Sequence, residues 1–345
     1  MKTRMTELLG IKYPIMLAGM SFVADDPEMV AAVSNAGGLG LLATAQFTPD
    51  KTRAAIRELR NLTDKPFGAN VTLQLTYARE NAEVCLEEKV PAINWSLGKA
   101  DWLIKAAHSY GGKCLGTVAI TKHALSAEKD GADAVIVTGH EAGGHGGDVT
   151  SLVLIPAIAS RVKIPVIAAG GFATGRGLVA ALALGAEGIS MGTRFALTKE
   201  SPVHKKTMEA CLKATEEDTF RTARIDGMDL RVLRSKTAER LARERLSLIN
   251  SMRSAKELKE VLNVPYWKLG IDLLKARDLP KLARQAMAAR GLRRAILDGD
   301  EKLGFMVIGQ VVGLTKDVPT CKELMERIGV EAEEIIEATR AKVLS

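Results

Sequence analysis

The sequence predicts an α/β protein built on a TIM (β/α)₈ barrel with an inserted helical lid. Short apolar runs of strand length alternate eight times with helix-length segments over roughly the first 200 residues, which is the pattern of eight β/α units. Glycine-rich loops follow several of these runs, whereas the competing open, doubly wound sheet would concentrate them at one switch point. Past residue 223 the alternation stops, and Arg, Lys and Leu recur at helical spacing.

The expected strands are rich in Val, Ile, Leu and Ala, as is usual for parallel strands covered on both faces. They are residues 15–17, 39–43, 67–73, 92–96, 113–118, 134–138, 165–169 and 188–191. Proline at the first turn marks the start of two helices, at Pro27 and Pro49, and Gly37 and Gly38 follow the end of the first. The expected helices are residues 27–35, 49–61, 77–89, 100–110, 121–130, 151–161 and 175–184.

The second half of the chain departs from this pattern. Residues 224–301 contain no clear strand, and residues 234–248 carry charge pairs at i,i+4 spacing, so we expect a helical insertion or lid. The apolar residues 303–313 are expected to return to the barrel, and an amphipathic helix is expected over residues 321–343. The predicted division is a barrel of residues 1–223 and 303–345 with a lid of residues 224–302.

Composition argues against several classes of protein. The formal net charge of +7 suits a basic enzyme with anionic ligands, and no nucleic-acid-binding module accompanies it. The four cysteines lie far apart without a CxxC pair, which favours reduced thiols over a disulfide framework or a metal site. No signal peptide and no run of roughly eighteen apolar residues occurs. We therefore expect a cytoplasmic enzyme with a small-molecule substrate, no nucleic-acid, membrane or metal partner, and surfaces that allow a homodimer.

The stretch around His145 is expected to carry the chemistry. Residues 134–147, AVIVTGHEAGGHGG, pass from a buried strand into glycine, and loops that follow barrel strands hold active sites. His140, Glu141 and His145 resemble a zinc-binding HExxH motif, but histidines five residues apart do not share a helix face. Residues 170–177 have the glycine spacing of a P-loop without its Lys and Ser or Thr. We reject both motifs.

Two further loops predict a phosphate site. Gly170 and Gly171 follow the seventh expected strand, and Met191, Gly192 and Thr193 end and follow the eighth. In (β/α)₈ barrels this pair of loops often binds phosphate through backbone N–H groups. Tight turns and helix caps would explain one such loop, whereas two in these positions favour a ligand.

The first loop and the third strand could contact a planar cofactor. Ala18, Gly19 and Met20 follow the first strand, and glycine allows close approach of a flat ring. Asn70 lies in an otherwise apolar strand, where a buried amide needs partners. The edge of a heterocycle and the neighbouring backbone are equally good partners for this amide.

Taken together, these segments resemble the nitronate monooxygenase (2-nitropropane dioxygenase) family, which is related to flavin-dependent enoyl-ACP reductases and to NADH:quinone reductases. The resemblance rests on YPIMLAGM, NAGGLG, FGANVTL, GADAVIVTGHEAGGH, PVIAAGGFATGRG and GAEGISMGTRF, which begin at residues 13, 35, 67, 131, 165 and 185. It covers residues 10–200 closely and 303–325 more loosely. The chain departs from the quinone-reductase branch at Thr117, where that branch tends to have lysine, and at Thr138, near which it has an acid.

The resemblance implies non-covalently held FMN, with its phosphate on Gly170, Gly171, Gly192 and Thr193. It also implies that His145 faces the reactive side of the flavin. The remaining residues expected to bind the cofactor are Ala18, Gly19, Met20, Asn70, Thr117, Thr138, Ala142, Gly143, Gly144 and Met191.

Three reactions are open at this point. In the first, a nitronate is oxidised with O₂, and His145 either stabilises the anion or takes the α-proton of a nitroalkane. In the second, NAD(P)H reduces the flavin, and hydride passes to an enoyl thioester or a quinone. A flavin-free isomerase or aldolase is the third, but the strand ends lack its carboxylate base or Schiff-base lysine. A binding module without catalysis would not need glycine loops around one histidine.

Overall fold

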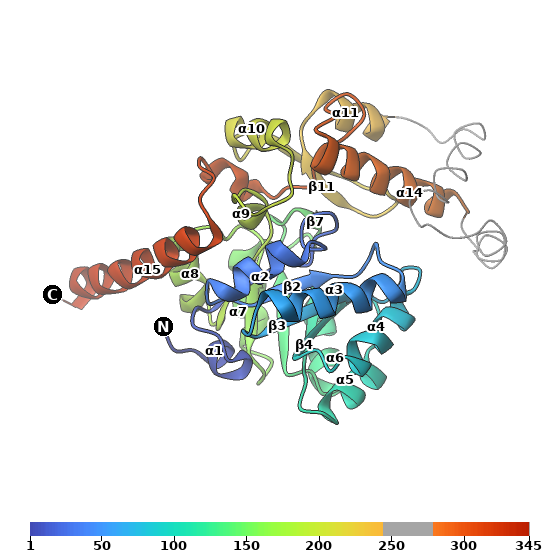
Figure 1. Ribbon diagram of the computed structural model, residues 1–345. Helices are drawn as coiled ribbons and strands as arrows, with labels where there is room; N and C mark the ends of the chain where they lie inside the picture. The colour runs from blue at the N-terminus through green and yellow to red at the C-terminus, as the bar shows by residue number, and fades with distance from the viewer. Residues whose placement is uncertain (244–278, 345) are drawn as a thin grey trace.

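The computed structural model describes residues 1–243 and 279–344. Its centre is a barrel of eight parallel strands in the order β1-β9-β8-β6-β5-β4-β3-β2, and a parallel bridge between Met16 and Leu39 closes it (Figure 1). The strands are β1 (Ile15–Leu17), β2 (Gly40–Ala43), β3 (Phe67–Thr72), β4 (Ala92–Ser96), β5 (Lys113–Val118), β6 (Ala134–Thr138), β8 (Val166–Ala169) and β9 (Gly188–Met191). The TIM barrel prediction is confirmed.

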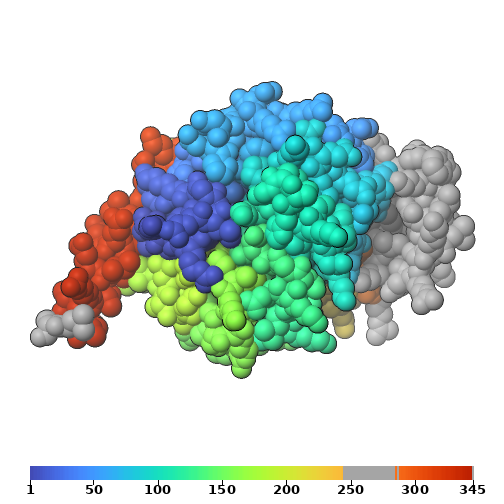
Figure 2. Space-filling model, turned by 90° about the horizontal axis from the view of Figure 1, so that it is seen from below, coloured from blue at the N-terminus to red at the C-terminus, as the bar shows by residue number. Residues whose placement is uncertain are grey.

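Helices surround the barrel, and most lie where the sequence predicts them. They are α1 (Arg4–Leu9), α2 (Pro27–Asn35), α3 (Pro49–Leu62), α4 (Ala78–Glu87), α5 (Asp101–His108), α6 (Thr121–Lys129), α7 (Ser151–Ala159) and α8 (Gly175–Ala183). Asp26 and Thr48 cap α2 and α3, each followed by the proline that marks the first turn. In Figure 2 the consecutive segments follow one another around one face of the molecule, as expected for successive β/α units.

The eighth outer helix comes from the far end of the chain. Strand β9 is followed only by the short α9 (Thr193–Ala196), and α15 (Cys321–Leu344) packs against α8 and α2 instead. The side of α15 that faces the barrel is apolar, with Leu324, Met325 and Ile328 buried. The terminal amphipathic helix is therefore part of the barrel, and its last turns project from the body (Figure 1).

A second, three-stranded antiparallel sheet lies over the barrel (Figure 1). It consists of β10 (Thr219–Thr222), β11 (Leu230–Leu233) and β7 (Gly144–His145). The prediction that residues 224–301 hold no strand is wrong, because β11 lies within them. Four residues give too short a periodic signal to detect, and their pairing partner β7 lies more than eighty residues away in sequence.

Three helices and two helical turns complete the part of this upper region that the structure describes. They are α10 (Lys205–Lys213), α11 (Lys236–Arg243), α14 (Leu279–Arg293), the π-helical turn η1 (Arg294–Asp298) and the 3₁₀ turn η2 (Gln310–Leu314). Residues 303–313 return to the barrel as expected, since the Gly309 N–H donates to Thr193 Oγ1 at 2.9 Å. The rest of the predicted lid, residues 244–278, lies outside the described residues. Among the described helices, none is long and apolar enough to cross a membrane.

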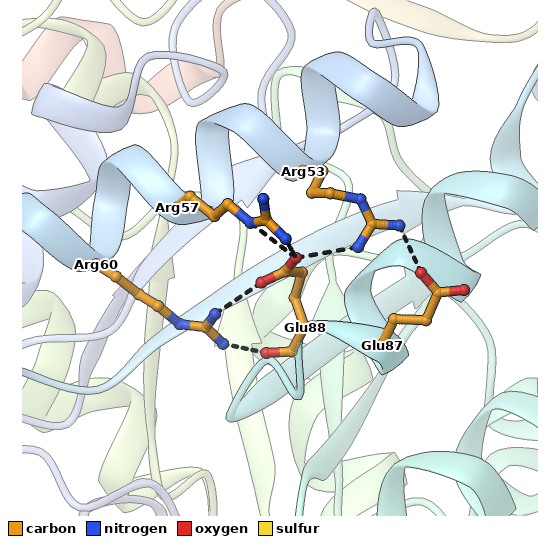
Figure 3. A network of polar contacts seen from close by, with 5 residues as sticks. All are labelled: Arg53, Arg57, Arg60, Glu87 and Glu88. Atoms are coloured by element: carbon orange, nitrogen blue, oxygen red, sulfur yellow. Dashed lines mark hydrogen bonds and ion pairs between the residues drawn. The ribbon is translucent and has the colours of Figure 1, made fainter.

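An ion-pair network joins α3 to the end of α4 (Figure 3). Arg53, Arg57 and Arg60 lie on one face of α3, and all three contact the carboxylate of Glu88, whose side chain is only 8% exposed. Arg53 also reaches Glu87. The network fixes the position of two neighbouring β/α units on the outside of the barrel.

Candidate active site at the carboxyl end of the barrel

The predicted site residues lie at one end of the barrel, because parallel strands bring their carboxyl ends to the same mouth. The Ala18 N–H donates to the Met191 carbonyl at 3.0 Å, which joins the first and eighth strand ends. Gly19 lies against Asn70 so closely that a Cβ on residue 19 would be 2.5 Å from the amide carbon. These two loops and β3 therefore form one continuous wall.

The two loops expected to bind phosphate follow the paired strands β8 and β9. Gly170 and Gly171 adopt φ of +93° and +88°, a region that favours glycine. Among the described residues no acceptor receives the backbone N–H of Gly171, Gly192 or Thr193. Three donors without partners at adjacent strand ends form a cradle that suits a phosphate group. The loops therefore fit the phosphate of a cofactor such as FMN.

A polar ladder crosses the inner wall on β3, β4 and β5. Asn70 Nδ2 donates to Asn94 Oδ1 at 2.6 Å, and Asn94 Nδ2 donates to Thr117 Oγ1 at 2.9 Å. Asn94 is a residue that sequence reasoning missed, although an amide inside a buried strand was the same signal that identified Asn70. Asn70 Oδ1 lies beside Gly19 and has no hydrogen-bond partner among the described residues, so it can accept a hydrogen bond from a ligand.

His145 has a partner that the sequence did not reveal. Its Nε2 lies 2.7 Å from Asp226 Oδ2, in the loop between β10 and β11. The Asp226 side chain is 9% exposed and that of His145 40%. Asp226 Oδ1 also accepts from the Met228 N–H at 3.0 Å, which fixes the carboxylate. A carboxylate on one ring nitrogen sets the tautomer and leaves Nδ1 available for a ligand.

Two arginines from the β10–β11 hairpin hold the loop that bears His145. Arg221 donates to the carbonyls of Gly146 and Gly147, both at 2.8 Å, and to His140 Nδ1 at 2.7 Å. Arg231 donates to the His140 carbonyl at 3.0 Å. Burial first, and then the neighbouring Arg221, lower the pKa of Arg231. Arg221 was not identified from the sequence, because nothing local relates residue 221 to this loop.

The three residues that resemble HExxH have separate partners. His140 meets Arg221, His145 meets Asp226, and Glu141 accepts from the N–H and hydroxyl of Ser151 at the start of α7. A carboxylate at a helix N-terminus is favourable for the helix. Within residues 1–243 and 279–344, no group of three or more His, Cys, Asp or Glu side chains could hold a metal ion.

The remaining predicted residues line the same loop. Thr138 ends β6 opposite Ala169, and Gly144 pairs with Arg231 in the upper sheet. Gly143 packs on the returning segment, where a Cβ would lie 2.7 Å from the Ile308 carbonyl carbon. Ala142 stands between them, and its N–H donates to the Gly139 carbonyl at 3.2 Å. The structure thus brings every predicted site residue to the barrel mouth or to the loop above it.

The fold and these loops define a (β/α)₈-barrel enzyme with its site at the carboxyl ends of the strands. Comparison with known proteins places the chain more narrowly: it belongs to the nitronate monooxygenase family, whose model matches residues 2–98 and 76–331. The protein is therefore an oxidoreductase.

Relatives and solved structures agree with this assignment. The chain is 37% identical over 348 residues to a (3aS,4S,5R,7aS)-5-hydroxy-7a-methyl-1-oxo-octahydro-1H-indene-4-carboxyl-CoA dehydrogenase of Rhodococcus jostii, covering 99% of this chain and 98% of that protein. It is 34% identical to a probable nitronate monooxygenase of Staphylococcus saprophyticus, covering 67% and 78%. The structure of FabK from Thermotoga maritima matches with a TM-score of 0.83 and 38% identity over 99% and 100% of the chains.

Proposed function

We propose that the protein holds FMN across the barrel mouth, with the phosphate on Gly170, Gly171, Gly192 and Thr193. The three unpaired backbone donors in this cradle support the assignment. The ring would lie among the wall and loop residues named above, with the Asn70–Asn94–Thr117 ladder along one edge. When bound, FMN supplies the acceptor for the electrons of the substrate.

The proposed activity is the oxidation of a nitronate or nitroalkane, and the His145–Asp226 pair is the observation that carries it. With Nε2 bonded to Asp226, a neutral imidazole presents the lone pair of Nδ1 and can take an acidic proton from carbon. Once protonated, the same ring attracts an anionic nitronate, and Asp226 stabilises its positive charge. In both roles the proton in question is the one bound at Nδ1 of His145.

In a second candidate function, the protein oxidises or reduces the carbon atoms next to an acyl thioester carbonyl. NAD(P)H is then the reductant when the thioester is reduced. The CoA dehydrogenase relative covers 99% of this chain, whereas the nitronate monooxygenase relative covers 67%. A thioester, like a nitro group, acidifies the neighbouring C–H, so the same imidazole serves both substrates.

His145→Ala tests the role of the imidazole. We expect turnover to fall by about 10²–10⁴-fold while the FMN content stays unchanged, because a positioned base contributes that factor. His108→Ala is the control, since this histidine ends α5 on the opposite side of the barrel from the mouth and pairs with Asp133 there. Undiminished turnover in His145→Ala would remove the residue from the mechanism.

Anaerobic mixing separates the two candidates. The flavin absorbance should bleach rapidly with an alkyl nitronate under the first proposal, and with an acyl thioester or NAD(P)H under the second. A colourless protein that takes up no FMN would reject both.

Three further properties are proposed alongside the activity: a lid, a cytoplasmic location and a homodimer. Residues 224–302 would act as a lid, since their hairpin strand reaches the His145 loop. A cytoplasmic location would suit the four free, buried cysteines. A homodimer would be detected by sedimentation of the purified protein.

A further inference from the structure

A cavity of about 680 Å³ lies in the upper region, apart from the barrel mouth. It is bounded by α10, the end of β11, the start of α11 and residues 301–306. Its volume is within the range of roughly 300–1,000 Å³ that small-molecule sites occupy. Nothing in the proposed flavin chemistry accounts for it.

The polar lining of this cavity is mainly cationic. Lys213, Lys236 and Lys302 line it, and among the described residues no carboxylate pairs with any of them. Arg234 and Arg240 add two guanidinium groups. The surplus of unpaired ammonium groups favours a ligand with more than one negative charge.

The two acidic residues of the lining do not cancel this charge. Asp218 accepts from the N–H and the hydroxyl of Thr215, both at 2.8 Å, and these bonds lower the pKa of its carboxyl group. It therefore stays ionised but is already engaged. Glu301 is exposed, and Arg234 is already paired with Glu239 at 3.1 Å, so the surplus charge of the lining rests on the three lysines, which have no carboxylate partner among the described residues.

The rest of the lining is apolar. Leu233, Phe305 and Met306 contribute their buried side chains, together with Ala210 of α10 and Ala214 at its C-terminal cap. Thr237 turns its hydroxyl away, to the carbonyls of Glu301 and Lys302 at 2.9 Å. An apolar floor beside a cationic rim matches a molecule with a flat heterocycle at one end and phosphates at the other.

The cavity is within reach of the reaction site. Leu230 on β11 lies opposite His145, and Leu233 at the other end of the strand lines the cavity. Three residues of strand span about 10 Å. The pantetheine arm of coenzyme A has more chain atoms than three residues of backbone, so it can bridge this distance.

We propose that this cavity binds the phosphorylated adenosine of a coenzyme A thioester, an inference that rests on the second candidate function above. The acyl group of the substrate would then be carried by coenzyme A itself. The adenosine 2′-phosphate of NADPH has similar chemistry, so the experiment must separate the two.

The direct test is calorimetric titration of the FMN-loaded protein with 3′,5′-ADP, the coenzyme A fragment, and with 2′,5′-ADP, the NADPH fragment. We expect 3′,5′-ADP to bind more tightly. In the double variant Lys213→Glu/Lys302→Glu the affinity for 3′,5′-ADP should fall by roughly tenfold, because two attractions between an exposed lysine and a ligand phosphate become repulsions. Lys206→Glu is the matched control, since this exposed lysine is on α10 outside the cavity lining and should leave binding unchanged.

A kinetic readout follows from the same variants. KM for an acyl-CoA should rise in the double variant, while KM for the corresponding acyl-pantetheine, which lacks the nucleotide, should not change. Absent binding of 3′,5′-ADP, or binding no tighter than that of 2′,5′-ADP, would overturn the proposal. Preferred binding of 3′,5′-ADP without thioester turnover would support the site and refute the thioester activity instead.

Discussion

At the residue scale, the Asp226 carboxylate decides how His145 is presented. Asp226→Asn places an amide against Nε2, which can reverse the tautomer and remove the negative charge. We expect kcat to fall by roughly tenfold or more with little change in KM, because the pair acts on the reacting proton rather than on binding.

Two comparisons separate this role from a purely structural one. Asp226→Glu should restore part of kcat, since it returns a carboxylate to the site, and Asp298→Asn should behave as wild type. Asp298 is half-exposed and pairs with Arg293, away from the mouth. Equal kcat for wild type and Asp226→Asn would count against the pair.

A second residue makes stability depend on pH. Burial raises the pKa of Asp25 to about 6 from 3.8. The folded protein thus binds this proton more tightly than the unfolded chain, so its stability falls as the pH rises from about 4 to about 6 and stays lower above that. Asp25→Asn should add up to about 3 kcal/mol to the free energy of unfolding at pH 8 and almost nothing below pH 4. Urea unfolding at both pH values measures this difference, and an equal gain at both would refute it.

At the scale of elements, the β10–β11 hairpin supports the loop that bears His145. The two terminal nitrogens of Arg221 donate hydrogen bonds to His140, Gly146 and Gly147, and so join the two ends of that loop. The buried Nε of Arg221 has no partner among the described residues. Arg221→Met should speed amide hydrogen exchange over residues 143–147 and lower turnover, since each hydrogen bond to a charged donor is worth about 1.5–3 kcal/mol. The exposed Arg224 of the same hairpin provides the control, Arg224→Met. Unchanged exchange in Arg221→Met would show that β-pairing alone holds the loop.

The α3–α4 network gives a second prediction at this scale (Figure 3). Burial raises the pKa of the Glu88 carboxyl, but Arg53, Arg57 and Arg60 together lower it below its usual value. Glu88 therefore stabilises the fold above the pKa of the unfolded chain, and that contribution is lost as the pH falls. Glu88→Gln should cost about 1–3 kcal/mol at pH 7, because it leaves three guanidinium groups without their carboxylate. Arg57→Ala should cost under about 1 kcal/mol, since that side chain is 65% exposed.

At the scale of the whole molecule, the C-terminal helix completes the barrel. Leu324, Met325 and Ile328 of α15 are buried against α8 and α2, whereas residues 336–343 are exposed. Deleting residues 335–345 should shift the melting temperature by only a few degrees. Deleting residues 321–345 should unfold the protein, because each large buried side chain contributes about 1.5–3 kcal/mol to a net stability of about 5–15 kcal/mol. Circular dichroism melts of both truncations test this, and a stable protein after the longer deletion would contradict it.

The amino-acid sequence by itself determined the barrel, its helix starts and the loops that line its mouth. These follow from local patterns, such as the apolar strands, the prolines at Pro27 and Pro49 and the glycines at Gly170 and Gly171, because the repeating β/α unit has one common closed arrangement. Asn70 was found in the same way, as a polar residue in an apolar strand.

Only the tertiary structure decided the partners of the His145 loop and the cavity in the upper region. Asp226 lies 81 residues from His145, and β11 becomes a strand through its pairing with β7 and β10. A hydrogen bond between distant residues depends on how the chain folds back on itself, and no short-range pattern encodes that path. The cationic cavity has the same origin, since Lys213, Lys236 and Lys302 come together only when three separate segments pack.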